Sequence, residues 1–173
     1  MQNILIVVDM QNDFIDGALG TPEAVAIVPA VEEKIRQFDG PVYFTRDTHA
    51  ETYMETQEGR NLPVPHCIHG SEGWQIRPQL DALRKTEAID KPTFGSTALG
   101  ELMKAADERE PIGSITLIGL CTDICVISNA LLLKAFLPEV PILVDAACCA
   151  GVTPQSHENA LAAMASCQIQ IIR

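Results

Sequence analysis

Short apolar runs alternate with amphipathic stretches along the chain. Six runs rich in β-branched residues have the length and composition of buried strands. They cover residues 3–8, 41–46, 86–90, 114–120, 140–146 and 168–172. Four stretches between them space their apolar residues three and four apart, as helices do. These are residues 24–38, 96–108, 122–137 and 153–166. Because strands and helices alternate and the strands are apolar throughout, the pattern predicts a parallel sheet covered on both faces.

Residues 47–85 interrupt this alternation with a long polar connection. It contains three prolines, three of the four histidines and the only tryptophan, Trp74. Connections of this length inside a compact domain are usually functional or disordered. The chain has no internal repeat, low-complexity tract or linker, and its 173 residues fit one domain, which we place at 1–173.

Polar and nucleophilic residues follow the predicted strands. In a doubly wound parallel sheet, ligands bind outside the carboxyl ends of the strands. Asp9 follows the first strand, Asp47 and His49 follow the second, Lys91 follows the third, and the run CTDIC at 121–125 follows the fourth. This concentration of reactive side chains at one edge of the sheet predicts a site there.

Two interpretations fit the cysteines of the CTDIC run. Both thiols are small buried core residues, or Cys125 is a nucleophile in the first turn of a helix, where the helix dipole favours a thiolate. Free backbone N–H groups there would hold an oxyanion. A nucleophilic thiol needs a base and a charged partner, which Asp9 and Lys91 supply. Taken singly, Asp9 is equally well a turn cap and Lys91 a solvated lysine.

The connection 47–85 also contains a candidate metal site. Asp47 and His49 lie two residues apart, and His66 follows, with His69 behind it. One carboxylate and two imidazoles with open positions are typical of a catalytic or substrate-orienting metal. The alternative is that these are solvated loop histidines.

The composition limits the kinds of binding partner and the cellular compartment that we expect. The net charge of −11 opposes binding to nucleic acid or to an anionic membrane. No apolar window is long enough to span a bilayer, and the N-terminal segment lacks the basic start of a signal peptide. The six cysteines therefore predict reduced thiols in the cytoplasm. No glycine-rich phosphate-binding motif is present, so no nucleotide cofactor is expected.

The motifs together resemble the isochorismatase-like cysteine hydrolases, which include nicotinamidases, other small-amide hydrolases and isochorismatases. The resemblance rests on VVDMQNDF at 7–14, the lysine after the third strand and IGLCTDICV at 118–126, and it extends through VDAACCAGVTPQSHENAL at 144–161. It implies a doubly wound α/β/α sandwich with a six-stranded parallel sheet in the order 3-2-1-4-5-6. It also implies a catalytic triad of Asp9, Lys91 and Cys125. A cis peptide before Cys121 would aim the backbone N–H groups of Cys121 and Cys125 at an oxyanion.

Within that family, RDTHAETY at 46–53 and PHCIHGSEGW at 65–74 are similar to the nicotinamidase metal motif. The similarity implies Asp47, His49 and His66 as ligands of one divalent ion, zinc or iron, and His69 matches no ligand position. Two features depart from that pattern: Pro63 stands where nicotinamidases have a tryptophan, and the lysine loop is short. We expect Phe14 and Phe94 to supply the ring-stacking surface instead.

The sequence thus predicts a cysteine-dependent hydrolase of a small planar amide, with nicotinamide as the first choice of substrate. The alternatives are a carbamoyl or ureido substrate, isochorismate, or a non-catalytic binding domain. Relatives generally form homo-oligomers, so at least a dimer is expected. No role is assigned to four cysteines or to His69; the cysteines are Cys67, Cys148, Cys149 and Cys167.

Overall fold

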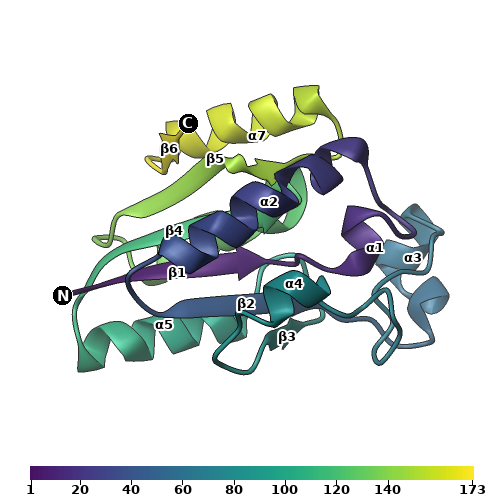
Figure 1. Cartoon of the computed structure of the whole chain (residues 1–173), viewed down its shortest axis with the longest axis horizontal. Helices are drawn as coiled ribbons and strands as arrows, with labels where there is room; N and C mark the ends of the chain where they lie inside the picture. The colour runs from purple at the N-terminus through teal and green to yellow at the C-terminus, as the bar shows by residue number, and fades with distance from the viewer.

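The computed structural model describes residues 1–173 and contains one six-stranded sheet in which every paired strand is parallel (Figure 1). The strand order is β3-β2-β1-β4-β5-β6, which confirms the predicted order 3-2-1-4-5-6. The strands are β1 (Gln2–Val8), β2 (Val42–Asp47), β3 (Ile89–Lys91), β4 (Ile112–Leu120), β5 (Ile142–Ala150) and β6 (Gln170–Ile172).

The helices cover both faces of this sheet. They are α1 (Asn12–Ile15), α2 (Pro22–Gln37), α3 (Gln57–Asn61), α4 (Pro78–Asp81), α5 (Thr97–Arg109), α6 (Ile127–Phe136) and α7 (Pro154–Ser166). A 3₁₀ turn, η1 (Tyr53–Glu55), precedes α3, and a π-helical turn, η2 (Thr122–Val126), leads into α6. No helix has both the length and the apolar character needed to cross a membrane.

The two faces have separate hydrophobic cores because successive side chains of a strand point to opposite sides. In β1, Ile4 and Ile6 pack with residues of α5, α6 and α7, whereas Leu5 and Val7 pack with residues of α1, α2 and α4. All four of these β1 side chains are fully buried. The uninterrupted apolar runs seen in the sequence therefore belong to strands covered on both faces, as predicted.

The predicted strand boundaries shift by up to four residues in the structure. The third strand begins at Ile89 rather than 86, because β2 pairs with it only through Thr45–Asp47. The sixth begins at Gln170 rather than 168, where Gln168 turns the chain with a φ of 67°. The fifth continues to Ala150, so Cys148 and Cys149 lie inside β5, with their side chains in the two different cores.

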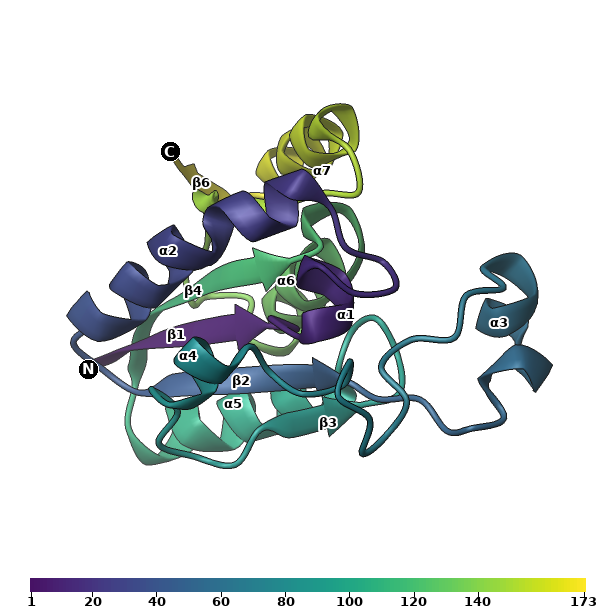
Figure 2. The same ribbon diagram turned by 45° about the vertical axis from the view of Figure 1, so that its right-hand side comes forward.

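The connection 47–85 is ordered by short helices rather than by strands. It contains η1, α3 and α4, and its η1–α3 part stands out beyond the carboxyl ends of β1 and β2 (Figure 2). Thr56 caps α3 by accepting a hydrogen bond from the Gly59 amide at 2.9 Å. This projecting part therefore stands at the edge of the sheet where the candidate site residues gather.

Candidate active site

Asp9, Lys91 and Cys125 meet at the carboxyl edge of the sheet. Asp9 follows β1, Lys91 is the last residue of β3, and Cys125 lies in η2 between β4 and α6. The Lys91 Nζ atom is 2.7 Å from Asp9 Oδ2 and 3.3 Å from Cys125 Sγ. All three side chains are buried. Strand β3 is separated from β1 by β2, and the long lysine side chain spans that distance.

The buried position of Asp9 changes its acidity. The Thr45 hydroxyl donates to Asp9 Oδ1 at 2.6 Å, and Lys91 lies beside the other carboxylate oxygen. Burial raises the pKa of Asp9, and the charge of Asp47 adds to that effect, although Lys91 opposes it. A carboxylate with a raised pKa is a better proton acceptor at neutral pH.

Lys91 and Cys125 respond to the same surroundings in different ways. Burial disfavours the charged ammonium, but the negative charges of Asp9 and Asp47, Asp9 above all, outweigh it and raise the pKa of Lys91. Burial, and then the charge of Asp9, raise the pKa of the Cys125 thiol well above its usual range. The arrangement therefore has a permanent cation beside a neutral thiol, and a carboxylate that can take the thiol proton.

The turn that carries Cys125 is anchored from two sides. The peptide bond Leu120–Cys121 is cis, as the resemblance implied. The amides of Ile124 and Val126 both donate to the Cys121 carbonyl, at 3.1 and 3.0 Å. Thr122 Oγ1 lies 2.7 Å from Nδ1 of His157 on α7, a contact that the sequence analysis did not identify. Helix α7 thus fixes the turn from outside the site.

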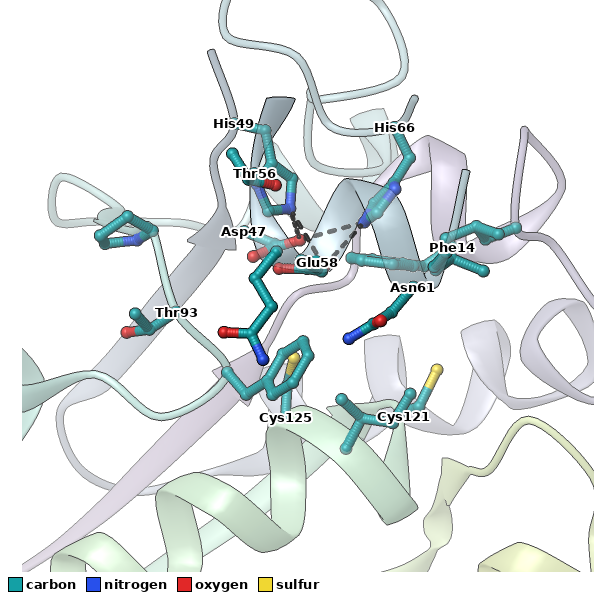
Figure 3. A pocket seen from close by; sticks show the side chains of 16 residues that line it. Phe14, Asp47, His49, Thr56, Glu58, Asn61, His66, Thr93, Cys121 and Cys125 are labelled. Atoms are coloured by element: carbon teal, nitrogen blue, oxygen red, sulfur yellow. Dashed lines mark hydrogen bonds and ion pairs between the residues drawn. The ribbon is translucent and has the colours of Figure 1, made fainter. Parts of the chain in front are cut away.

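The three predicted metal ligands also come together, and Glu58 of α3 joins them. Asp47, His49, Glu58 and His66 each offer one ligand atom, and these atoms lie within 4.8 Å of one another (Figure 3). Nε2 of His49 is 2.9 Å from Asp47 Oδ2 and 3.6 Å from Glu58 Oε1. Nε2 of His66 is 3.5 Å from Asp47 Oδ2 and 3.8 Å from Glu58 Oε1.

The chemistry of these four groups fits a divalent metal. Nδ1 of His66 lies 2.8 Å from the Val64 carbonyl, which can only accept, so a neutral His66 ring has Nε2 free to ligate. Burial alone would raise the pKa of Asp47, but hydrogen bonds from His49 and His66 and the charge of Lys91 lower it. Two imidazole nitrogens and two carboxylate oxygens are a donor set suited to zinc or iron.

One cavity of about 560 Å³ is lined by Cys125 and by all four candidate metal ligands, whereas Asp9 and Lys91 do not line it. Cys121 and Cys125 line it on one side and the four candidate metal ligands on another (Figure 3). Both predicted aromatic residues line the same cavity, with Phe14 buried and Phe94 45% exposed. The cavity wall also includes Asn61 of α3, which the sequence pattern gave no means to select.

His69 and Trp74 lie outside this cavity. Their ring centroids are 4.7 Å apart, and the guanidinium of Arg46 lies 3.8 Å from the centroid of the Trp74 ring. The Trp74 indole also donates to Thr48 Oγ1 at 2.9 Å. These contacts pack the connection 47–85 against the end of β2, beside the metal-ligand residues.

Comparison with known proteins identifies the family. Residues 3–173 match the family model described as the isochorismatase domain. The chain is 32% identical to an uncharacterized isochorismatase family protein, PncA, of Bacillus subtilis, over 96% of this chain and 96% of that protein. It is 25% identical to the nicotinamidase/pyrazinamidase of Mycobacterium tuberculosis, over 97% of each.

Solved structures agree with this match. The pyrazinamidase of Pyrococcus horikoshii, solved in complex with zinc, has a TM-score of 0.80 and 28% identity, with 100% of this chain and 99% of that chain covered. The nicotinamidase PncA of Bacillus subtilis has a TM-score of 0.78 and 29% identity, with 100% of both chains covered. The N-carbamoylsarcosine amidase of Thermoplasma acidophilum has a TM-score of 0.73 and 26% identity, over 100% of this chain and 96% of that one. The chain belongs to the isochorismatase family.

Proposed function

We propose that this protein hydrolyses small planar ring amides through Cys125, with nicotinamide converted to nicotinate and ammonia as the leading reaction. The observation that carries the proposal is the single cavity lined by both Cys125 and the four metal-ligand residues. A ring amide held there by its ring nitrogen presents its amide carbon to the thiol. Similarity to the nicotinamidase and pyrazinamidase structures supports the same assignment.

In the first step Asp9 accepts the Cys125 thiol proton while the sulfur attacks the amide carbon. A carbon–sulfur bond forms, and the carbonyl π electrons move onto oxygen. The Lys91 ammonium lies 2.7 Å from Asp9 Oδ2 and 3.3 Å from Cys125 Sγ. It therefore offsets the negative charge both when that charge is on the carboxylate and when it develops on the sulfur. Because the thiol pKa is raised, deprotonation coupled to attack costs less than forming a free thiolate first.

Two further steps complete the reaction. Backbone N–H groups of Cys121 and Cys125 hold the oxyanion, as such donors do at the start of a helix. The carbon–nitrogen bond then breaks, Asp9 returns its proton to the leaving nitrogen, and ammonia departs from a thioester. Water, deprotonated by Asp9, attacks the thioester carbon. The carbon–sulfur bond then breaks, Asp9 gives the proton to the sulfur to restore the Cys125 thiol, and the carboxylic acid leaves.

Asp47, His49, Glu58 and His66 are the residues that would hold a divalent ion, which we propose to be zinc or iron. When bound, that ion supplies a Lewis-acidic position for a ring nitrogen of the substrate. Phe14 and Phe94 stand on the walls of the cavity and are placed to contact the faces of a ring. Holding the amide carbon next to the nucleophile in this way contributes much of the rate acceleration in such reactions.

A carbamoyl or ureido amide is the second candidate. Phe94 is 45% exposed, so the aromatic lining of the cavity is open to solvent on that side, and Pro63, which stands where the nicotinamidase motif has a tryptophan, does not line the cavity. An open wall accommodates a substrate without an aromatic ring more readily than a closed aromatic pocket would. The 26% identity to an N-carbamoylsarcosine amidase supports the same alternative.

Ammonia release from a matched panel of amides tests these assignments. Nicotinamide, benzamide and a carbamoyl amino acid are compared with the metal-loaded protein and with protein stripped by a chelator. We expect nicotinamide to be the best substrate, benzamide to be much poorer, and metal removal to raise the Michaelis constant for nicotinamide far more than it slows alkylation of Cys125. Equal turnover of benzamide and nicotinamide would contradict the nicotinamidase assignment, and preference for the carbamoyl compound would establish the alternative.

The proposal also covers the oligomeric state of the protein and its cellular compartment. We expect a homo-oligomer, and sedimentation showing only monomer at working concentration would contradict this. All six cysteines are free, in keeping with a reducing compartment such as the cytoplasm.

A further inference from the structure

One buried amide joins the nucleophile turn to a wall of the cavity. Asn129 lies on α6, one helical turn after Cys125, and its side chain is fully buried. Its Nδ2 donates to the Cys125 carbonyl at 2.8 Å and to the Phe94 carbonyl at 3.1 Å. Its Oδ1 accepts from the Ser96 amide at 2.9 Å. Both amide N–H groups and the oxygen are therefore used.

The segment between Lys91 and Ser96 has few other restraints. Residues 92–95 form neither helix nor strand, and they include Thr93 and Phe94 of the cavity wall. Within the segment, the Thr93 hydroxyl donates to the Gly95 carbonyl at 2.7 Å and Lys91 Nζ donates to the Thr93 carbonyl at 3.1 Å. Asn129 is the side chain that ties Phe94 and Ser96 to helix α6.

Asn129 thus ties the Phe94 part of the wall to the backbone of Cys125, whereas Lys91 links the Thr93 carbonyl to the Cys125 sulfur. A backbone carbonyl of the wall and the carbonyl of the nucleophile share the same donor nitrogen. Because the amide is buried and fully satisfied, its geometry is rigid, and loss of either contact leaves a buried polar group without a partner.

We propose that Asn129 is a positioning residue that sets the distance between the Phe94 ring and the Cys125 thiol, and thereby determines how well a planar ring fits beside the nucleophile. The proposal deepens the proposed function and rests on Cys125 being the nucleophile. It assigns the role to a group that contacts neither substrate nor reacting atoms. Its effect is on ring-containing reagents and not on the reactivity of the thiol itself.

The Asn129→Thr variant separates these two effects. A threonine hydroxyl on a helix bonds to the carbonyl four residues earlier, so the contact with Cys125 is kept while the contacts with Phe94 and Ser96 are lost. The measurement is the rate of Cys125 alkylation by N-phenyl iodoacetamide relative to iodoacetamide, followed by mass spectrometry of the Cys125 peptide. We expect this ratio to fall about tenfold in Asn129→Thr, with the iodoacetamide rate unchanged. The Michaelis constant for nicotinamide should rise in parallel.

A double-mutant cycle with Phe94→Ala provides the decisive control. If Asn129 acts through the ring wall, Asn129→Thr lowers the ratio in the native background and has no further effect once Phe94 is absent. Equal losses in both backgrounds, or equal slowing of both reagents, would show a general structural role and overturn the proposal. Asn159→Thr, an exposed change on α7, should leave the ratio unchanged. The alkylation ratio does not require nicotinamide turnover, so failure of the proposed substrate is distinguishable from failure of this inference.

If Asn129→Thr unfolds, Asn129→Asp gives a second measurement. An aspartate of the same shape keeps the acceptor for the Ser96 amide and removes the paired N–H donors. We expect a fall in the alkylation ratio again, together with cooperative melting. A ratio equal to that of the native protein would overturn the proposal.

Discussion

The Lys91 ammonium nitrogen lies 2.7 Å from Asp9 Oδ2 in a site where both side chains are fully buried. An ion pair removed from water is favourable only when its geometry is good and its remaining polar atoms find partners. Here the Thr45 hydroxyl and the Cys125 thiol complete the group. The pair keeps a charged lysine beside the thiol while leaving Asp9 basic enough to accept a proton.

Asp9→Asn should slow both hydrolysis and alkylation of Cys125, and loss of the carboxylate beside the buried Lys91 ammonium should lower the melting temperature. An amide cannot accept the thiol proton, and loss of a general base typically costs ~10²–10⁴-fold. The rates are measured by ammonia release and by iodoacetamide labelling. Asp90→Asn, which removes an exposed carboxylate paired with Arg46, is the control. Unchanged labelling of Asp9→Asn would show that Asp9 does not activate the thiol.

Cys125→Ala should abolish hydrolysis, whereas Cys121→Ala should retain most of it. Cys121 contributes its backbone, and burial together with the charge of Asp123 raises the pKa of its thiol to about 12, so it stays protonated at neutral pH. Turnover and melting temperature of the two variants are compared side by side. Equal losses in both would mean that the Cys121 thiol takes part in the chemistry.

Glu58→Gln should weaken metal binding by more than the ~10–100-fold that loss of an outer-shell partner costs. The glutamate oxygen is one of four ligand atoms within 4.8 Å of one another, and a neutral amide is a weaker ligand. Bound zinc is measured against a chromogenic chelator. Glu55→Gln, at an exposed carboxylate of η1, should bind zinc as the native protein does. Native affinity in Glu58→Gln would restrict the site to the three ligands found from the sequence.

His157 should make the protein less stable as the pH falls below about 6.5. Burial lowers the pKa of His157, so between its folded pKa and 6.5 the unfolded chain binds more protons than the folded one. Stability therefore rises with pH through that window and is constant above it. Glu158, Arg173 and Asp123 are the charged groups that also influence this histidine.

His157→Asn removes that titration, so its melting temperature should change less between pH 7.5 and pH 5.5 than that of the native protein, a range of about two units around the ordinary pKa of an unfolded-chain histidine. Thermal melts of metal-free protein at the two pH values provide the test. A native pH dependence that persists in the variant would assign it to another group.

The sequence by itself determined the sheet and the residues at its edge. The spacing of apolar residues in a strand or helix reflects which of its faces is buried, so this spacing can be recognised in the sequence. Parallel strands bring their carboxyl ends to one edge of the sheet. The sequence alone therefore places four residues together at that edge: Asp9, Asp47, Lys91 and Cys125. The resemblance to a known family added roles to those positions.

Tertiary structure alone decided the contacts made between elements. The connection 47–85 has no periodic pattern, so nothing in the sequence distinguished Glu58 from Glu51 or Glu55 until η1 and α3 turned it toward His49 and His66. Asn129 looked like one polar position on an apolar helix, because two of its partners, Ser96 and Phe94, lie more than thirty residues away. Such contacts depend on how separate elements pack against each other, and they produce no periodic pattern in the sequence.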